Sequence, residues 1–144
     1  MKHLITLAML LCLCPAVVVA QNPVTATTTP TVVVAHRSFT GRTSNIQQTV
    51  LFTPASTGIF RVTVDVEESD TSDASPVEPF ISWTSDFTVV DASVPLTVNQ
   101  AGVSASASGQ ITIRAHAGTP IQLIALVDPK ERGTYNLYVV IEKL

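Results

Sequence analysis

Carboxylates form the densest group of side chains in this sequence that could bind an ion. Asp65, Glu67, Asp70 and Asp73 lie within nine residues, and carboxylate oxygens are the hard ligands that calcium prefers. The segment SDTSDAS, which holds the last two, has neither the glycine nor the ligand spacing of a helix–loop–helix calcium loop. We therefore interpret the run as a solvated acidic loop that keeps a strand edge from pairing. The sequence predicts no metal site, and these four acids are its calcium candidates.

Motifs for catalysis are missing. The sequence has no Gly-x-Ser-x-Gly nucleophile elbow, no His-Glu-x-x-His pair and no glycine-rich phosphate loop. His116 follows Arg114 on the polar side of an alternating stretch, and His36 precedes Arg37. We expect both histidines to be solvated strand residues rather than general bases or zinc ligands. The chain is therefore predicted to be non-enzymatic, with no catalytic residue and no cofactor.

Trp83 is the single tryptophan and has two interpretations. An aromatic face suits the C–H groups of a sugar ring, which makes Trp83 a candidate stacking platform for a ligand. Ile81, however, lies in register beside it on the same side of an extended segment. This spacing favours packing of Trp83 against the core, with the stacking role left open.

The N-terminus resembles a secretory signal peptide. Lys2 gives a basic start, an apolar run follows from Leu4, and small residues end the segment at Ala20. A membrane anchor is the alternative, but this stretch contains a proline and is marginal in length for a span. A lipoprotein would need a small residue before its cysteine, whereas leucines precede Cys12 and Cys14. We expect secretion to the periplasm or the extracellular space, cleavage after Ala20, and a mature chain without cysteine.

The remaining sequence reads as β-strands. In the stretch from Gly58 to Glu68, apolar and polar residues alternate from Phe60 to Glu67, with Phe60, Val62, Val64 and Val66 on one side, which is typical of a half-buried strand. No segment has a helical period, and turn signals recur between short apolar runs. The sequence predicts an all-β, antiparallel, jelly-roll-like sandwich of about eight to ten short strands.

The expected organisation is a signal peptide over 1–20, a Thr/Pro-rich extended tail over 21–31 and one β-sandwich domain over 32–144. The other expected strands lie at 31–36, 45–53, 80–84, 87–90, 94–98, 110–117, 121–127 and 134–144, with 101–108 as a weak edge strand or a loop.

Two C-terminal stretches are apolar on both sides. In Ile121 to Val127, Ile124 and Leu126 face away from the other apolar residues, and Tyr138 and Val140 do the same in the last stretch. A short turn separates the two stretches, so we expect them to pair and to join these four residues into one outward apolar patch. Such a patch usually marks an interface. The alternative is that the chain's own tail or loops cover it.

Several segments resemble a known family. TGIFRVTVDV, SGQITIRAHAGTPIQLIAL and the closing YNLYVVIEKL are similar to the strands of trimeric jelly rolls of the complement globular-head and tumour-necrosis-factor-like type. Ser82-Trp83-Thr84 is also similar to a motif of small secreted bacterial β-proteins. The resemblance covers roughly 50–144 and implies a jelly roll that assembles as a homo-oligomer, with a trimer as the family's form. No collagen-like Gly-X-Y stalk accompanies it.

The sequence thus favours a secreted structural or adhesive module that self-associates. The alternative is a monomeric extracellular module that binds a ligand of carbohydrate type, a glycan or a protein. The chain has 11 acidic against 8 basic residues and a formal charge of −3. This balance disfavours a nucleic-acid partner, whose phosphates need a basic surface. No membrane span is expected once the signal peptide is removed.

Overall fold

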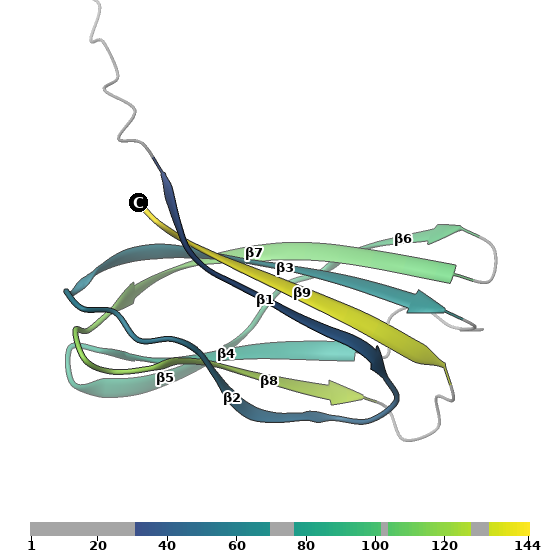
Figure 1. The fold of residues 1–144 in the computed structure, drawn as a ribbon, viewed down its shortest axis with the longest axis horizontal. Helices are drawn as coiled ribbons and strands as arrows, with labels where there is room; N and C mark the ends of the chain where they lie inside the picture. Colours follow the sequence, from purple (N-terminus) through teal and green to yellow (C-terminus); the bar gives the residue numbers. More distant parts are fainter. Residues whose placement is uncertain (1–30, 70–76, 102–103, 128–132) are drawn as a thin grey trace, which may run out of the picture.

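A computed structural model describes residues 31–69, 77–101, 104–127 and 133–144. The signal peptide expected over 1–20, nearly all of the expected tail, and the calcium candidates Asp70 and Asp73 lie outside these residues. The described segments form nine strands and no helix (Figure 1). The strands are β1 (Val32–Arg42), β2 (Ile46–Phe52), β3 (Gly58–Ser69), β4 (Val77–Ser85), β5 (Thr88–Ser93), β6 (Thr97–Ala101), β7 (Ser104–Ala115), β8 (Ile121–Val127) and β9 (Thr134–Lys143).

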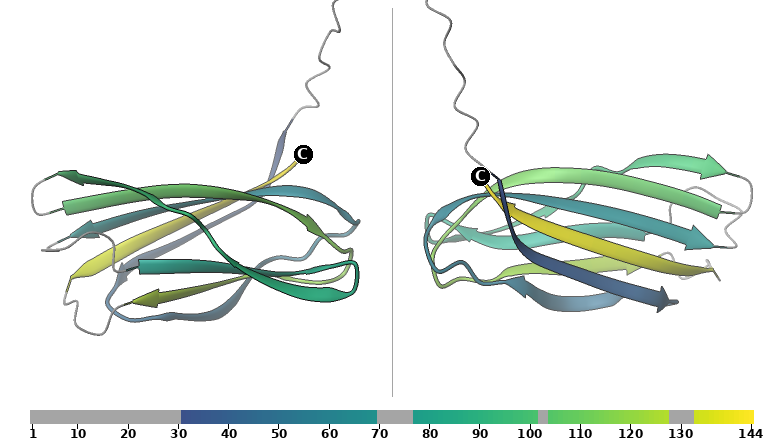
Figure 2. Two further views of the ribbon diagram at one scale, coloured as in Figure 1. Left: turned by 180° about the vertical axis from the view of Figure 1, so that it is seen from behind. Right: turned by 45° about the horizontal axis from the view of Figure 1, so that its top comes forward.

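The strands form two stacked antiparallel sheets, which confirms the predicted all-β sandwich (Figure 2). The five-stranded sheet has the order β1-β9-β3-β7-β6, and the four-stranded sheet has the order β2-β8-β4-β5. The strand pairs nest: β1 pairs with β9, β2 with β8, β3 with β7, and β4 with β5. The chain therefore folds back on itself at the β4–β5 turn, and the later strands pair with the earlier ones in reverse order.

Strand β3 lies at the centre of the five-stranded sheet, hydrogen-bonded to β7 on one side and β9 on the other. Its alternation is the one that the sequence predicts. Phe60, Val62, Val64 and Val66 are buried, while Asp65 and Glu67 point to solvent. The buried side of β3 faces the four-stranded sheet, because the apolar side chains of a sandwich gather between its layers.

The core fills the space between the sheets. Phe60 packs against Phe52 of the other sheet, with ring centroids 6.0 Å apart. Strand β8 contributes Ile121, Leu123 and Ala125, each without exposed area. The remaining large core side chains are Ile46, Leu51, Val77, Ile81, Val94, Ile113, Tyr135, Leu137, Val139 and Ile141.

The expected pairing of the two C-terminal strands is wrong. β8 lies between β2 and β4, whereas β9 lies between β1 and β3 in the other sheet. Each strand is thus central in its own sheet, and its inner apolar face fills the core from one side. β8 therefore ends in one layer of the sandwich and β9 begins in the other. Sequence spacing does not distinguish these cases, since packed sheets are only about 10 Å apart.

Two further strand assignments differ from expectation. The small-residue stretch 101–108 is mostly the first half of the twelve-residue β7, because its alanines Ala105 and Ala107 face the core. The edge strand expected at 94–98 begins only at Thr97, as β6. Pro95 lies in the crossover that carries the chain from the four-stranded to the five-stranded sheet. A proline has no amide for a ladder, which agrees with its place outside the strands.

The crossover passes very close to β7 at Gly109. A Cβ atom at Gly109 would lie 2.2 Å from the carbonyl oxygen of Pro95, a distance that side-chain carbons do not tolerate. Glycine at this position therefore allows the crossover to seal one end of the core, where Val94 is buried.

Candidate functional site

The outer face of each sheet is the side turned away from the other sheet, and the two outer faces differ in character. On the five-stranded sheet, the central strands present polar side chains. Arg61 and Glu142 are cross-strand neighbours and form an ion pair of 2.6 Å. The other polar side chains of this face on β3 and β7 are Thr63, Asp65, Glu67, Ser106, Ser108, Gln110, Thr112 and Arg114.

The outer face of the four-stranded sheet carries an apolar group instead. Phe80 of β4 and Ile124 of β8 are directly opposite each other, and both are half-buried. Leu126, next along β8 on the same face, is 43% exposed, and Val50 of β2 is 48% exposed. We call Val50, Phe80, Ile124 and Leu126 the apolar patch. Central strands with this many large apolar side chains on the solvent side are unusual for an isolated sandwich.

The four interface residues predicted from the sequence are divided between the two faces. Ile124 and Leu126 belong to the apolar patch, whereas Tyr138 and Val140 lie on the outer face of the five-stranded sheet. Tyr138 and Val140 are half-buried between polar neighbours of β1 and β3, including His36 beside Val140. The four residues therefore do not form one continuous surface within a single chain, because the sandwich separates the pairs by its full thickness.

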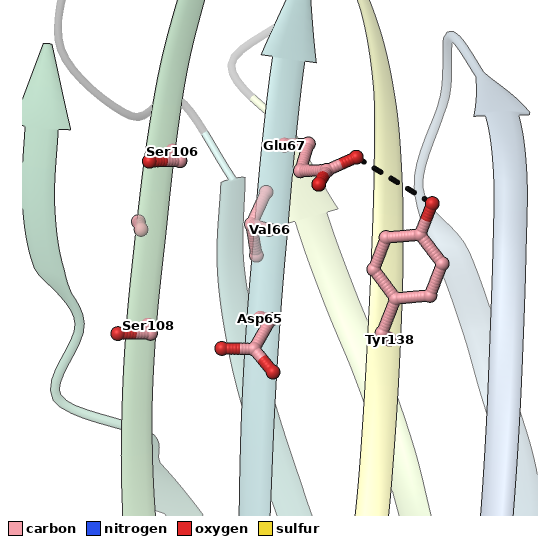
Figure 3. Close-up of a pocket in the computed structure, with 7 residues that line it drawn as sticks. Asp65, Val66, Glu67, Ser106, Ser108 and Tyr138 are labelled. Carbon is pink, nitrogen blue, oxygen red and sulfur yellow. Dashed lines mark hydrogen bonds between the residues drawn. The ribbon is translucent and has the colours of Figure 1, made fainter.

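A hollow of about 380 Å³ lies on the polar outer face, across β7, β3 and β9 (Figure 3). Asp65 is flanked by Ser108 on one side and Tyr138 on the other, and Glu67 is flanked by Ser106. The Tyr138 hydroxyl donates a long hydrogen bond of 3.5 Å to Glu67 Oε2. Figure 3 shows both carboxylates and the tyrosine ring standing on the solvent side of the sheet. The hollow thus combines two carboxylates, two serine hydroxyls and one aromatic ring.

This set of groups suits a small cationic or hydroxylated molecule better than a metal ion. Asp65 and Glu67 are two residues apart on one strand, and so about 7 Å apart along it. Calcium binds six to eight oxygens at 2.3–2.6 Å, which two carboxylates at this spacing do not supply. The part of the chain that the structure describes holds no group of three or more potential metal ligands.

Trp83 packs against the core, as favoured from the sequence. Its side chain is half-buried among the residues that border the core cluster, and on β4 it is opposite Val90 of β5. The indole Nε1 is buried without a hydrogen-bond partner. The ring therefore offers little free face for stacking a ligand.

Sequence reasoning missed the turn between β4 and β5. Asp86 and Phe87 are the two residues of this turn, and Phe87, expected to begin a strand, is 85% exposed. His116, expected on a solvated strand face, lies just beyond the end of β7, half-buried, with its ring 4.8 Å from that of Phe87. Arg114 forms an ion pair with Asp86. The two-residue spacing between the strands was the available signal, but neither residue is a glycine.

No family model matches this chain, and no curated protein is significantly similar to it. Within the described segments, no helix has the length and apolar character needed to cross a membrane.

Proposed function

We propose that this protein is a secreted, non-enzymatic structural or adhesive module that self-associates through the apolar patch of the four-stranded sheet. The observation that carries the proposal is the position of Phe80, Ile124 and Leu126 on the solvent side of two central strands. A partner that covers the patch removes apolar surface from water. This burial stabilises the association by about 25 cal/mol for each Å² of apolar surface buried.

The choice of this face over the other follows from their composition. An interface core is depleted in charged residues and enriched in large apolar and aromatic ones. The outer face of β3 contains Arg61, Asp65 and Glu67, which would have to be desolvated in a close contact. The apolar patch is bordered by two acids, Glu78 opposite Leu126 and Asp91 diagonal to Phe80, and neither lies between its central members Phe80 and Ile124. A second copy of the chain fits such a surface, since symmetric oligomers bury the same patch on each subunit.

The strand pairing supports a jelly roll as the finer description of the sandwich. A jelly roll is a double-sheet antiparallel fold in which paired strands wrap around the core. The nested pairs from β1–β9 to β4–β5 have this form, with β6 as an added edge strand. A trimer is the assembly that the resemblance to the complement-head and tumour-necrosis-factor-like proteins suggests.

The direct test is the mass of the purified protein in solution. We expect light scattering at micromolar concentration to give a mass above that of one chain. A monomer under these conditions contradicts self-association, and the ligand-binding alternative then becomes the leading function.

That alternative now centres on the hollow rather than on Trp83. Asp65, Glu67 and Tyr138 present carboxylates and an aromatic ring to one small volume, a mixture that would suit a protonated amine or an amino sugar. Titration with glucosamine, followed by the NMR signals of Tyr138, tests it. Asp65→Asn with Glu67→Gln should abolish the response, and equal responses of this variant and the parent protein contradict the alternative.

A further inference from the structure

The β4–β5 turn has a backbone geometry that its residues do not favour. Asp86 and Phe87 both have positive φ, 45° and 68°, in a two-residue connection between paired Ser85 and Thr88. Positive φ at both central positions is the pattern of a type I′ turn, where Asn-Gly and Asp-Gly are preferred. Phe87 therefore stands where glycine would be more stable, because its Cβ opposes the left-handed conformation.

Folding does not recover this cost by burying the ring. Phe87 is 85% exposed, the largest exposed fraction among the large apolar side chains described. Its ring contacts that of His116, with the ring centroids 4.8 Å apart and an interplanar angle of 48°. A strained, solvent-facing aromatic residue points to a role outside the fold's own stability.

The turn is nevertheless held firmly. Arg114 Nη1 donates to Asp86 Oδ1, and the amide of His116 donates to the Thr84 carbonyl at 2.9 Å. Two residues after His116, the amide of Gly118 donates a hydrogen bond of 2.8 Å to the Pro54 carbonyl, which lies in the β2–β3 connection. Three connections thus meet at one end of the sandwich, at the left of Figure 1. These contacts hold the backbone of the turn in place, which reduces the entropy lost when something binds to it.

The neighbours of the ring decide what could bind. Asp86 and Arg114 form an ion pair beside the turn, and their side chains are 72% and 56% exposed. An apolar pocket of a protein, or a lipid bilayer, closing over Phe87 would strip water from both charges, which is costly. A sugar ring offers a face of C–H groups for the aromatic ring and hydroxyls at its edge. These hydroxyls can replace water on the carboxylate and on the free N–H groups of the guanidinium.

We propose that Phe87, with Asp86, Arg114 and His116, forms a contact site for a neutral glycan at this end of the sandwich. The sugar ring stacks on the exposed face of Phe87, and its hydroxyls bond to the Asp86–Arg114 pair. This site is separate from both the apolar patch and the hollow, and it does not depend on the proposed self-association.

Titrations of the ¹⁵N-labelled protein, expressed from the full-length chain, test this proposal. The probes are the methyl β-glycosides of glucose, galactose and N-acetylglucosamine. We expect saturable shifts at the amides of Phe87, Thr88 and Arg114 with at least one probe, with dissociation constants of about a millimolar. No saturable shift at these amides with any of the three glycosides overturns the proposal.

Two substitutions at one position separate stacking from folding. Phe87→Gly removes the ring and relaxes the backbone together, so it should remain folded and bind at least about tenfold more weakly. Phe87→Trp keeps an aromatic face and should bind as tightly as the parent protein or more tightly. Equal weakening by both variants overturns the stacking role.

Two controls separate this site from its neighbours. Val89→Ser alters an exposed apolar side chain of the same hairpin and should leave binding unchanged. Arg114→Ala should weaken binding about tenfold by removing hydroxyl contacts. Shifts confined to Asp65, Glu67 and Tyr138, unchanged in Phe87→Gly, place binding in the hollow and overturn the proposal.

Discussion

Phe80 and Ile124 are direct cross-strand partners on adjacent central strands, and both side chains point away from the core. The corresponding pair at the centre of the other sheet is Thr63 and Val140, a polar and an apolar residue. An aromatic and a β-branched residue in such a pair stabilise the sheet locally, yet the pair still leaves apolar area facing water. The four-stranded sheet is therefore the face where a charge should act on assembly rather than on folding.

We predict that Leu126→Asp dissociates the oligomer and leaves the chain folded. Leu126 is 43% exposed, so an aspartate there stays in water in the monomer but would be buried in the assembly. Light scattering should report a lower mass, with the circular dichroism spectrum unchanged. Val140→Asp is the matched substitution on the other sheet. Loss of mass in Val140→Asp and not in Leu126→Asp would move the interface to the five-stranded sheet.

Phe60→Ala should lower the free energy of unfolding by about 3–5 kcal/mol, the usual range for emptying a core aromatic site. Phe60 is 1% exposed and contacts Phe52 across the two sheets. Urea denaturation measures the change. The neighbouring Ile59→Ala is the control, because Ile59 is 49% exposed and should cost less than about 1 kcal/mol. Similar losses at the two positions would contradict the assignment of faces on β3.

The central strand was predictable from sequence because its side chains contain the whole signal. Apolar and polar residues alternate from Phe60 to Glu67, and a period of two fixes which side is buried. The alternation within a strand does not determine which strands pair with it. Strands β8 and β9 are apolar on both faces whether they pair with each other or lie centrally in separate sheets, so the pattern alone could not separate these topologies.

The candidate sites show the same limit. The hollow arises because β7 and β9 bring serine hydroxyls and Tyr138 beside Asp65 and Glu67, a juxtaposition of residues more than thirty positions apart. The sequence identified the two acids, but Asp70 and Asp73, the calcium candidates grouped with them, lie outside the described residues. In the β4–β5 turn, Phe87 stands where a strand over 87–90 is expected, and the conformational cost at its position cannot be seen without its φ of 68°.

Gly109→Ala should destabilise the fold by about 1–3 kcal/mol, the cost of forcing extra volume into a packed site. Its new methyl group would meet the Pro95 carbonyl at 2.2 Å, and the clash is with backbone, which cannot rotate away. Gly58→Ala is the control, because its Cβ would lie at ordinary contact distance, 3.5 Å or more, from the side chains of Lys143 and Phe60. Thermal denaturation compares the two. An equal effect of both variants would show that the close crossover does not require glycine.

Tyr135 should make stability fall at high pH. Burial raises the pKa of its hydroxyl above the usual value of 10.0, although Arg42 acts in the opposite direction. The folded state therefore holds this proton more tightly than the unfolded chain does. The resulting stabilisation is complete below about pH 10 and is lost as the pH rises through the folded pKa.

The variant that isolates this effect is Tyr135→Phe. It removes the hydrogen bond of 2.8 Å from the hydroxyl to the Ser44 carbonyl, at a cost of about 1 kcal/mol at neutral pH. Urea denaturation between pH 8 and about 11 should show a steeper loss of stability in the parent protein than in Tyr135→Phe. Parallel curves would assign the alkaline loss to other groups.

The backbone strain at the β4–β5 turn can be measured without any ligand. Phe87→Gly and Phe87→Ala both remove the ring and its contact with His116, so the two variants differ in how well residue 87 accepts a φ of 68°. Glycine populates this region freely, whereas alanine keeps the Cβ that opposes it. We expect Phe87→Gly to be more stable than Phe87→Ala by about 1 kcal/mol in urea denaturation. Equal stabilities would mean that the turn holds Phe87 without strain, and the backbone at this position would then give no reason to expect a binding role.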